Sequence, residues 1–99
     1  IVLGAKLDIG EMRAVGRLPD GSVVTYSMRY NPNQAPQNFA GRVAVEHGRI
    51  GQEVFGEFKA RIARGQLTVA EANGTHWHEV NGRLAERFGM IYTRTVKAR

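Results

Sequence analysis

Cysteine is absent from the 99 residues of this chain. The absence excludes disulfide bridges, thiol nucleophiles and zinc sites built on thiolates. Long hydrophobic runs are absent too, because no stretch approaches the roughly 18 apolar residues that a membrane-spanning helix needs. We therefore expect a cytoplasmic protein without a membrane span. The length predicts one domain over residues 1–99, and because the chain begins at Ile1, we expect a fragment or a processed product.

Lysine is also scarce, since only 3 of the 14 basic residues are lysine and 11 are arginine. The net charge is +5 and the sequence pI is about 10.2. The planar guanidinium of arginine matches phosphate, whereas lysine is the commoner choice for solubility alone. We therefore expect a polyanion, and in particular a nucleic acid, as the partner. RNA is favoured because of the histidines described below. The alternatives are generic basicity and an acidic protein partner.

The first third of the chain predicts a β-hairpin over residues 11–30. Apolar and polar residues alternate on both sides of Pro19-Asp20-Gly21. In that turn the proline presets φ, the aspartate caps the turn and the glycine accepts a positive φ. Ile1-Val2-Leu3 predicts a short additional strand at the edge of the sheet.

Two helices are predicted after the hairpin, over about residues 38–64 and 68–88. Large apolar residues recur close to the helical period in both segments. Gly48 and Gly51 would each cost about 1 kcal/mol in a helix interior. We therefore expect a kink or a break at residues 48–51.

The second helical segment carries its own start and stop signals. Thr68 followed by Glu71 predicts a capping box, and Gly89 predicts the C-terminal stop. Asn73-Gly74 predicts an interruption, after which Thr75 would cap a further helix. The sequence therefore predicts two short helices in this segment.

Residues 90–96 predict a last strand that returns to the sheet. The resulting order indicates an α+β fold, in which the helices cover one face of a small antiparallel sheet. The opposite face would display the polar residues that occupy every second position of the strands. They are Glu11, Arg13, Arg17, Thr25, Ser27 and Arg29, with Thr93 and Thr95 if the last strand is in register.

Three arginines on this uncovered face, Arg13, Arg17 and Arg29, are predicted to contact phosphate. Hydroxyl side chains accompany them, which is typical of surfaces that position a nucleic-acid backbone. The alternative interpretation is a merely solvated face, which is common in antiparallel sheets.

The chain has three histidines, at positions 47, 76 and 78. Histidine titrates near neutral pH, so a pair can supply the base and the acid for phosphodiester cleavage. We predict that His78 transfers protons, with His76 or His47 as its partner. We expect Thr75 to place His76 and His78 at a helix start, where an anion binds. The alternative for His76 is a packed core histidine, because Val80 follows it by four residues.

The function predicted from these residues is a small ribonuclease that uses no metal and no cofactor, with arginines stabilising the transition state. A non-catalytic nucleic-acid-binding module and a protein-interaction domain stay open. An NAD-linked activity also stays open, although the chain is short for it.

Two metal-dependent alternatives carry less weight. His76 and His78 could bind zinc from an extended loop, with Glu79 or Glu46 completing the set. Glu57-Phe58-Lys59 matches the E-x-K element of restriction-type nucleases. That family needs the element on a strand, whereas the pattern here is helical.

The opening Ile1-Val2-Leu3-Gly4 resembles the junction at which C-terminal toxin domains begin in bacterial polymorphic toxins. Such domains are typically small, often basic and frequently nucleases. The resemblance implies an effector that acts in the cytoplasm of a target cell, with an acidic immunity or inhibitor protein as a partner. It rests on this short segment, on size and on charge, and it implies no catalytic residue.

Overall fold

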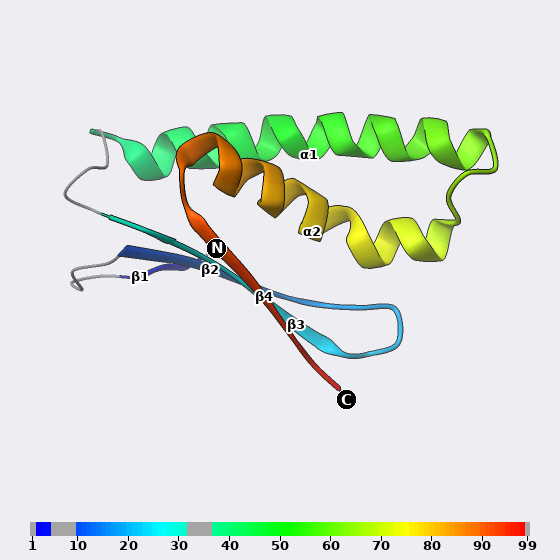
Figure 1. The fold of residues 1–99 in the computed structure, drawn as a ribbon, viewed down its shortest axis with the longest axis horizontal. Coiled ribbons are helices and arrows are strands. Elements are labelled where there is room, and N and C mark those ends of the chain that lie inside the picture. The colour runs from blue at the N-terminus through cyan, green and yellow to red at the C-terminus, as the bar shows by residue number, and fades with distance from the viewer. Residues whose placement is uncertain (1, 5–9, 32–36, 99) are drawn as a thin grey trace.

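The computed structural model of the protein describes residues 2–4, 10–31 and 37–98 (Figure 1). These residues form four strands and two helices, which confirms the predicted α+β fold. In chain order the elements are β1 (Val2–Gly4), β2 (Gly10–Arg17), β3 (Val23–Tyr30), α1 (Phe39–Ala63), α2 (Val69–Phe88) and β4 (Ile91–Lys97).

The strands form one sheet in the order β1-β2-β3-β4, and all neighbours are antiparallel. The turn between β2 and β3 has the predicted chemistry. Gly21 has a φ of 90°, and its amide donates to the Leu18 carbonyl at 2.9 Å. The Ser22 amide donates to Asp20 Oδ1 at 2.8 Å. This turn fixes the hairpin register, and β4 joins β3 as an edge strand.

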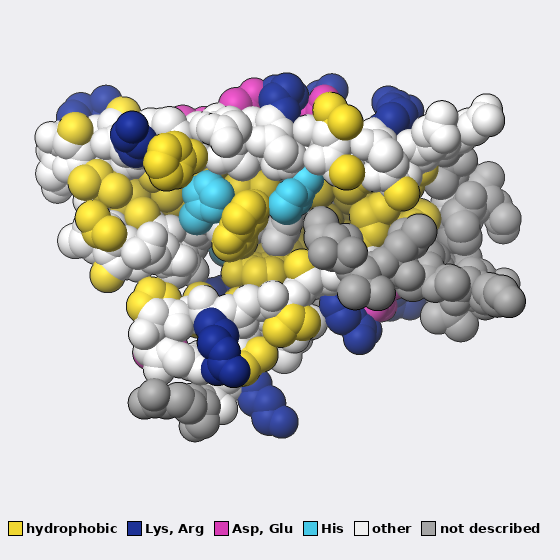
Figure 2. All heavy atoms as spheres, turned by 180° about the vertical axis from the view of Figure 1, so that it is seen from behind, with side chains coloured by type: hydrophobic (Ala, Val, Ile, Leu, Met, Phe, Trp, Pro, Cys, Tyr) yellow, Lys and Arg dark blue, Asp and Glu magenta, His cyan; other side chains and the backbone are white. Residues whose placement is uncertain are grey.

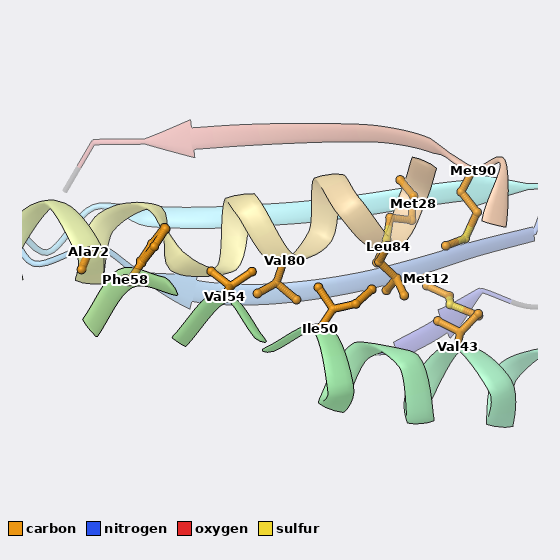
Figure 3. Close-up of a cluster of buried hydrophobic side chains, with 11 residues drawn as sticks. Met12, Met28, Val43, Ile50, Val54, Phe58, Ala72, Val80, Leu84 and Met90 are labelled. Atoms are coloured by element: carbon orange, nitrogen blue, oxygen red, sulfur yellow. The ribbon is translucent and has the colours of Figure 1, made fainter. Parts of the chain in front are cut away.

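Both helices lie on the same face of the sheet (Figure 1). The alternation in β3 explains why, because Tyr26 and Met28 are only 5% and 1% exposed, whereas Thr25 and Ser27 on the other face are partly exposed. The core lies between the two helices and the sheet, and it is built from side chains of α1, α2 and the strands (Figure 3). Its members include Met12, Met28, Val43, Ile50, Val54, Phe58, Val80 and Leu84.

The predicted break at residues 48–51 is wrong, because α1 runs without interruption from Phe39 to Ala63. Gly48 is exposed, and no neighbouring group lies near the position of a side chain there. The helix buries Val43, Ile50, Val54 and Phe58 on one stripe. Burying such side chains contributes about 1.5–3 kcal/mol each, which exceeds the cost of about 1 kcal/mol for each glycine.

The predicted interruption of the second helix at Asn73-Gly74 is also wrong. The capping box at Thr68 and Glu71 is present, and α2 continues from Val69 to Phe88. Thr75 lies inside the helix, where its hydroxyl donates to the Glu71 carbonyl at 2.7 Å instead of capping a new helix. Gly89 ends the helix with a φ of 65°, as predicted. Neither helix is long and apolar enough to cross a membrane in the described part of the chain.

Candidate functional site

His78 and Tyr92 form a polar pair between α2 and β4. His78 Nδ1 lies 2.8 Å from the Tyr92 hydroxyl oxygen, and the two ring centroids are 5.5 Å apart. Burial, followed by the nearby Tyr26, raises the pKa of Tyr92 to about 12, and Arg94 opposes the rise. The hydroxyl therefore keeps its proton at neutral pH, and its oxygen can accept a hydrogen bond from the Nδ1–H of His78. The Nε2 atom of His78 is then the nitrogen left to exchange a proton with a ligand.

Arg94 lies two residues further along β4, on the same face of the sheet as Tyr92. The register pairs Arg94 with Tyr26, so it lies on the hairpin-turn side of Tyr92. Its Nε atom is buried and has no hydrogen-bond partner among the described residues. A buried donor without a partner costs about 1–3 kcal/mol. Nε is closed to solvent, so an anion reaches it only if neighbouring side chains move, although phosphate is an anion that a guanidinium matches well.

A hollow of about 580 Å³ lies beside His78, between the β2–β3 turn and α2. Its lining includes Leu18, Asp20 and Pro19 from the turn side and Thr75, His78 and Glu79 from α2. The hydrogen bonds from Ser22 lower the pKa of Asp20, so this carboxylate is charged at neutral pH. Carboxylates accept hydrogen bonds from hydroxyl and amino groups and repel phosphate. Arg61 of α1 also lines the hollow, which therefore carries charges of both signs, and Arg94 is not among its lining residues.

His47 and His76 lie together at a different place, around Trp77. The ring of His47 is stacked on Trp77 at a centroid distance of 5.2 Å, and His76 meets Trp77 edge to face at 4.8 Å. His47 Nε2–H donates to Asn81 Oδ1 at 3.2 Å, and His76 Nε2–H donates to the Gly51 carbonyl at 3.2 Å. Both side chains thus bridge α1 and α2, as packed histidines do.

The structure therefore divides the three predicted catalytic residues. His76 and His78 are two residues apart, and such residues do not share a helix face. His76 contacts α1, whereas His78 contacts β4. Both lie inside α2 and not at its start, so the expected anion site at a helix N-terminus is absent at these histidines.

The three predicted phosphate-binding arginines share the uncovered face of the sheet. Arg13 lies opposite Ser27, Arg17 opposite Val23, and Arg29 opposite Glu11. All three arginines are exposed. Arg13 forms an ion pair with Glu11 at 2.5 Å, and Arg17 donates to the Gly21 carbonyl at 3.3 Å.

The last strand extends this face in the predicted register. Thr93 pairs with Ser27, Thr95 pairs with Thr25, and Lys97 adds a further cation opposite Val23. Ile91 is the apolar exception on β4, with 65% of its surface exposed. Around the apolar Val15, Val23 and Ile91, the face therefore presents four cations, one carboxylate and four hydroxyls, which are Arg13, Arg17, Arg29, Lys97, Glu11, Thr25, Ser27, Thr93 and Thr95.

The residues proposed for metal sites do not come together. Among the described residues, no group of three or more histidine, aspartate or glutamate side chains could hold a metal ion. The Glu57-Phe58-Lys59 element lies within α1, where Arg83 binds the Glu57 carboxylate through two bonds of 2.8 and 2.7 Å. Glu57 is thus engaged in joining the two helices.

Sequence reasoning missed Tyr92 and Arg94. The signal lay in the alternation of side chains along the last strand. Tyr92, Arg94 and Val96 lie on the face of the sheet that is turned toward the helices. An arginine at an inward position of a strand is unusual, because arginine is almost never buried unless it is paired. That observation alone could have marked Arg94.

Comparisons of the chain with protein-family models, with curated proteins and with solved structures gave no match.

Proposed function

We propose that this domain cleaves RNA without a metal ion, with His78 as the proton-transfer group. One observation carries the proposal, which is the hydrogen bond between His78 and Tyr92, with Arg94 two residues from Tyr92 on the same face of β4. A histidine held by a second side chain and accompanied by a cation is the minimum that acid–base cleavage of a phosphodiester requires.

The edge position of β4 supports contact between this pair and an RNA bound on the arginine face. Strand residues alternate between faces, so Tyr92 and Arg94 point toward α2 while Thr93 and Thr95 point toward the arginines. β4 has no further strand beside it among the described residues. An RNA backbone that crosses this edge can therefore contact both faces of the sheet within a few residues.

The proposed reaction is a transesterification within the RNA. His78 Nε2 removes the proton of the 2′-hydroxyl, and the 2′-oxygen forms a bond to phosphorus. The bond from phosphorus to the 5′-oxygen breaks, and this oxygen takes up the proton. The products are a 2′,3′-cyclic phosphate and a 5′-hydroxyl. One histidine can accept and return the same proton, while Arg94 neutralises the charge on the phosphoryl oxygens.

A second candidate, binding without cleavage, is favoured by the arginine face alone. Its cations and hydroxyls line up across three strands and need no histidine. In either form, a delivered toxin with an acidic immunity protein is a setting that fits the surface charge.

The test is cleavage of a fluorescently labelled RNA by the purified domain in EDTA. We expect His78→Ala to lower the rate by about 10²–10⁴-fold, the usual contribution of a general acid–base group. His47→Gln and His76→Gln are the matched controls and should retain activity once their folding is verified. Arg94→Ala should lower the rate by about 10²-fold, with partial recovery in Arg94→Lys.

Two results would overturn the proposal. The first is an RNA that stays intact under all conditions while still binding the domain, which leaves the binding module. The second is a His78→Ala protein that cleaves at the parent rate.

A further inference from the structure

A second hollow, which shares only Phe58 with the lining of the hollow beside His78, lies between α1 and α2. It has a volume of about 310 Å³, at the lower end of the range of about 300–1,000 Å³ for small-molecule pockets. Its lining includes Phe55, Phe58 and Lys59 from α1 and Asn73, His76 and Trp77 from α2. A pocket of this size accepts one small ring-bearing molecule. We call it the Trp77 pocket.

Aromatic side chains of the Trp77 pocket are unusually accessible. Phe55 is 53% exposed and Trp77 is 47% exposed, although both are large apolar residues. Figure 2 shows histidine side chains among exposed hydrophobic side chains on this face of the molecule. Aromatic rings that line an open hollow offer a stacking surface for a planar ligand.

The position of Trp77 is fixed before any ligand arrives. His47 covers one ring face of Trp77 with an interplanar angle of 4°. On the α1 side, a Cβ at Gly51 would lie 3.9 Å from the indole, so the ring packs closely against the helix. A rigid wall costs little conformational entropy when a ligand binds, and that favours affinity.

Two polar side chains complete the pocket. The Lys59 ammonium lies 5.4 Å from the centroid of the Phe55 ring, and no carboxylate lies within ion-pair distance of it in the described residues. The exposed Asn73 amide carries donors and an acceptor together, which is the pattern that matches the edge of a nucleobase.

We infer that the Trp77 pocket binds a single nucleotide. The base lies among Phe55, Phe58 and Trp77, its polar edge meets Asn73, and its phosphate pairs with Lys59. The inference goes beyond the proposed cleavage, because the pocket uses the α2 face that carries His76 and Trp77 and not the one that carries His78. The same chemistry is offered by a free mononucleotide and by one unit of an RNA strand.

The experiment uses Trp77 itself, since it is the only tryptophan in the chain. Its fluorescence is followed, with excitation at the red edge of its absorption, during titration with each of the four nucleoside 5′-monophosphates. The same ligands are measured by equilibrium dialysis. The parallel titrations use the matching nucleosides, ribose 5-phosphate, indole-3-acetate and a short oligonucleotide.

We expect a saturable change with at least one mononucleotide and none with ribose 5-phosphate. The nucleoside should bind about fivefold more weakly than its nucleotide, the upper end of what an exposed ion pair contributes. Lys59→Gln should remove that difference, whereas the matched control Arg64→Gln, which loses the same charge elsewhere, should keep it. Asn73→Ala should change the order of preference among the four bases. Tighter binding of the oligonucleotide than of the mononucleotide would identify an RNA strand as the source.

Several outcomes would overturn the inference. They are no binding by either method, equal affinity for nucleoside and nucleotide, equal effects of Lys59→Gln and Arg64→Gln, or tighter binding of indole-3-acetate than of any nucleotide. His78→Ala separates this result from the proposed cleavage, because it should leave the fluorescence titration unchanged whether or not it abolishes RNA cleavage.

Discussion

The imidazole of His78 and the hydroxyl of Tyr92 are joined across the interface of α2 and β4 by a hydrogen bond of 2.8 Å. The bond occupies Nδ1 and fixes the orientation of the ring. In acid–base catalysis, a group that orients the histidine matters because it holds the correct tautomer and geometry. Tyr92 is thus a positioning residue in the proposed site.

Tyr92→Phe tests this positioning role, because it removes the hydroxyl and keeps the ring that packs against the core. We expect the rate of RNA cleavage to fall on the order of tenfold, since His78 remains but loses its fixed orientation. The pH–rate profile of the variant should also be displaced from that of the parent protein. An unchanged rate and an unchanged profile would show that the hydroxyl has only a structural role. Thermal unfolding serves as the control for folding.

The unbroken course of α1 leads to a prediction on two glycines. Gly48 is exposed within the helix, and nothing lies near the position of an added Cβ, so Gly48→Ala should stabilise the protein by about 0.5–1 kcal/mol. Gly89 has a φ of 65°, so Gly89→Ala should destabilise it by about 1–2 kcal/mol. Urea unfolding followed by circular dichroism measures both. A destabilising Gly48→Ala would indicate that the helix is bent there.

His47 makes part of the free energy of unfolding depend on pH. Burial lowers the pKa of His47 below its ordinary value of 6.5, the bond to Asn81 partly opposes this, and His76 lowers it further. His47 therefore takes up a proton near pH 6.5 in the unfolded chain, whereas in the folded chain it does so only at a lower pH. The contribution of His47 to stability is full above pH 6.5, is lost as the pH is lowered from there to the folded pKa, and does not change further below it.

His47→Gln removes this titration while keeping a side chain that can donate to Asn81. We expect the difference in free energy of unfolding between the parent and the variant to shrink as the pH falls below about 6.5. The control is the exposed Gln52→Ala, which removes no ionisable group and should keep the pH dependence of the parent. Unfolding curves of parent and His47→Gln that stay parallel from neutral to acid pH would contradict the prediction.

The sequence predicts this fold well where local rules and burial agree. The alternation around Met28, the turn at Asp20 and the cap at Thr68 each have one consistent interpretation, and the structure has all three. The predicted breaks at Gly48 and at Asn73-Gly74 fail because helix propensity is a weak term beside the burial of an apolar stripe.

The histidine arrangement was less accessible from sequence. The direction of His76 toward α1 and of His78 toward β4 depends on how α2 sits between those elements, and no local pattern encodes that placement. The pairing of His47 with Trp77 likewise joins residues from different helices. The sequence therefore indicated His78 by its residue type and Arg94 by its inward position on the strand, whereas the contact of His78 with Tyr92 had no sequence signal.

The last prediction concerns the arginine face. Arg13, Arg17 and Arg29 are exposed on the side of the sheet opposite the helices, so replacing them with alanine leaves the core untouched. We expect the triple alanine variant to weaken RNA binding across sequences. Each lost phosphate contact should reduce the salt slope, the change of log K with log salt concentration, by about 0.7–0.9.

The matched control removes the same charge from the helical layer. Arg42, Arg49 and Arg64 are exposed there, and their triple alanine variant has the same net charge as the first variant. If the sheet face binds the RNA backbone, only the first variant should lose a large part of the salt slope, because counterions are released where phosphates are contacted. Equal losses in the two variants would show that net charge and not this face governs binding. An unchanged affinity in the first variant would reject the assignment of these three arginines.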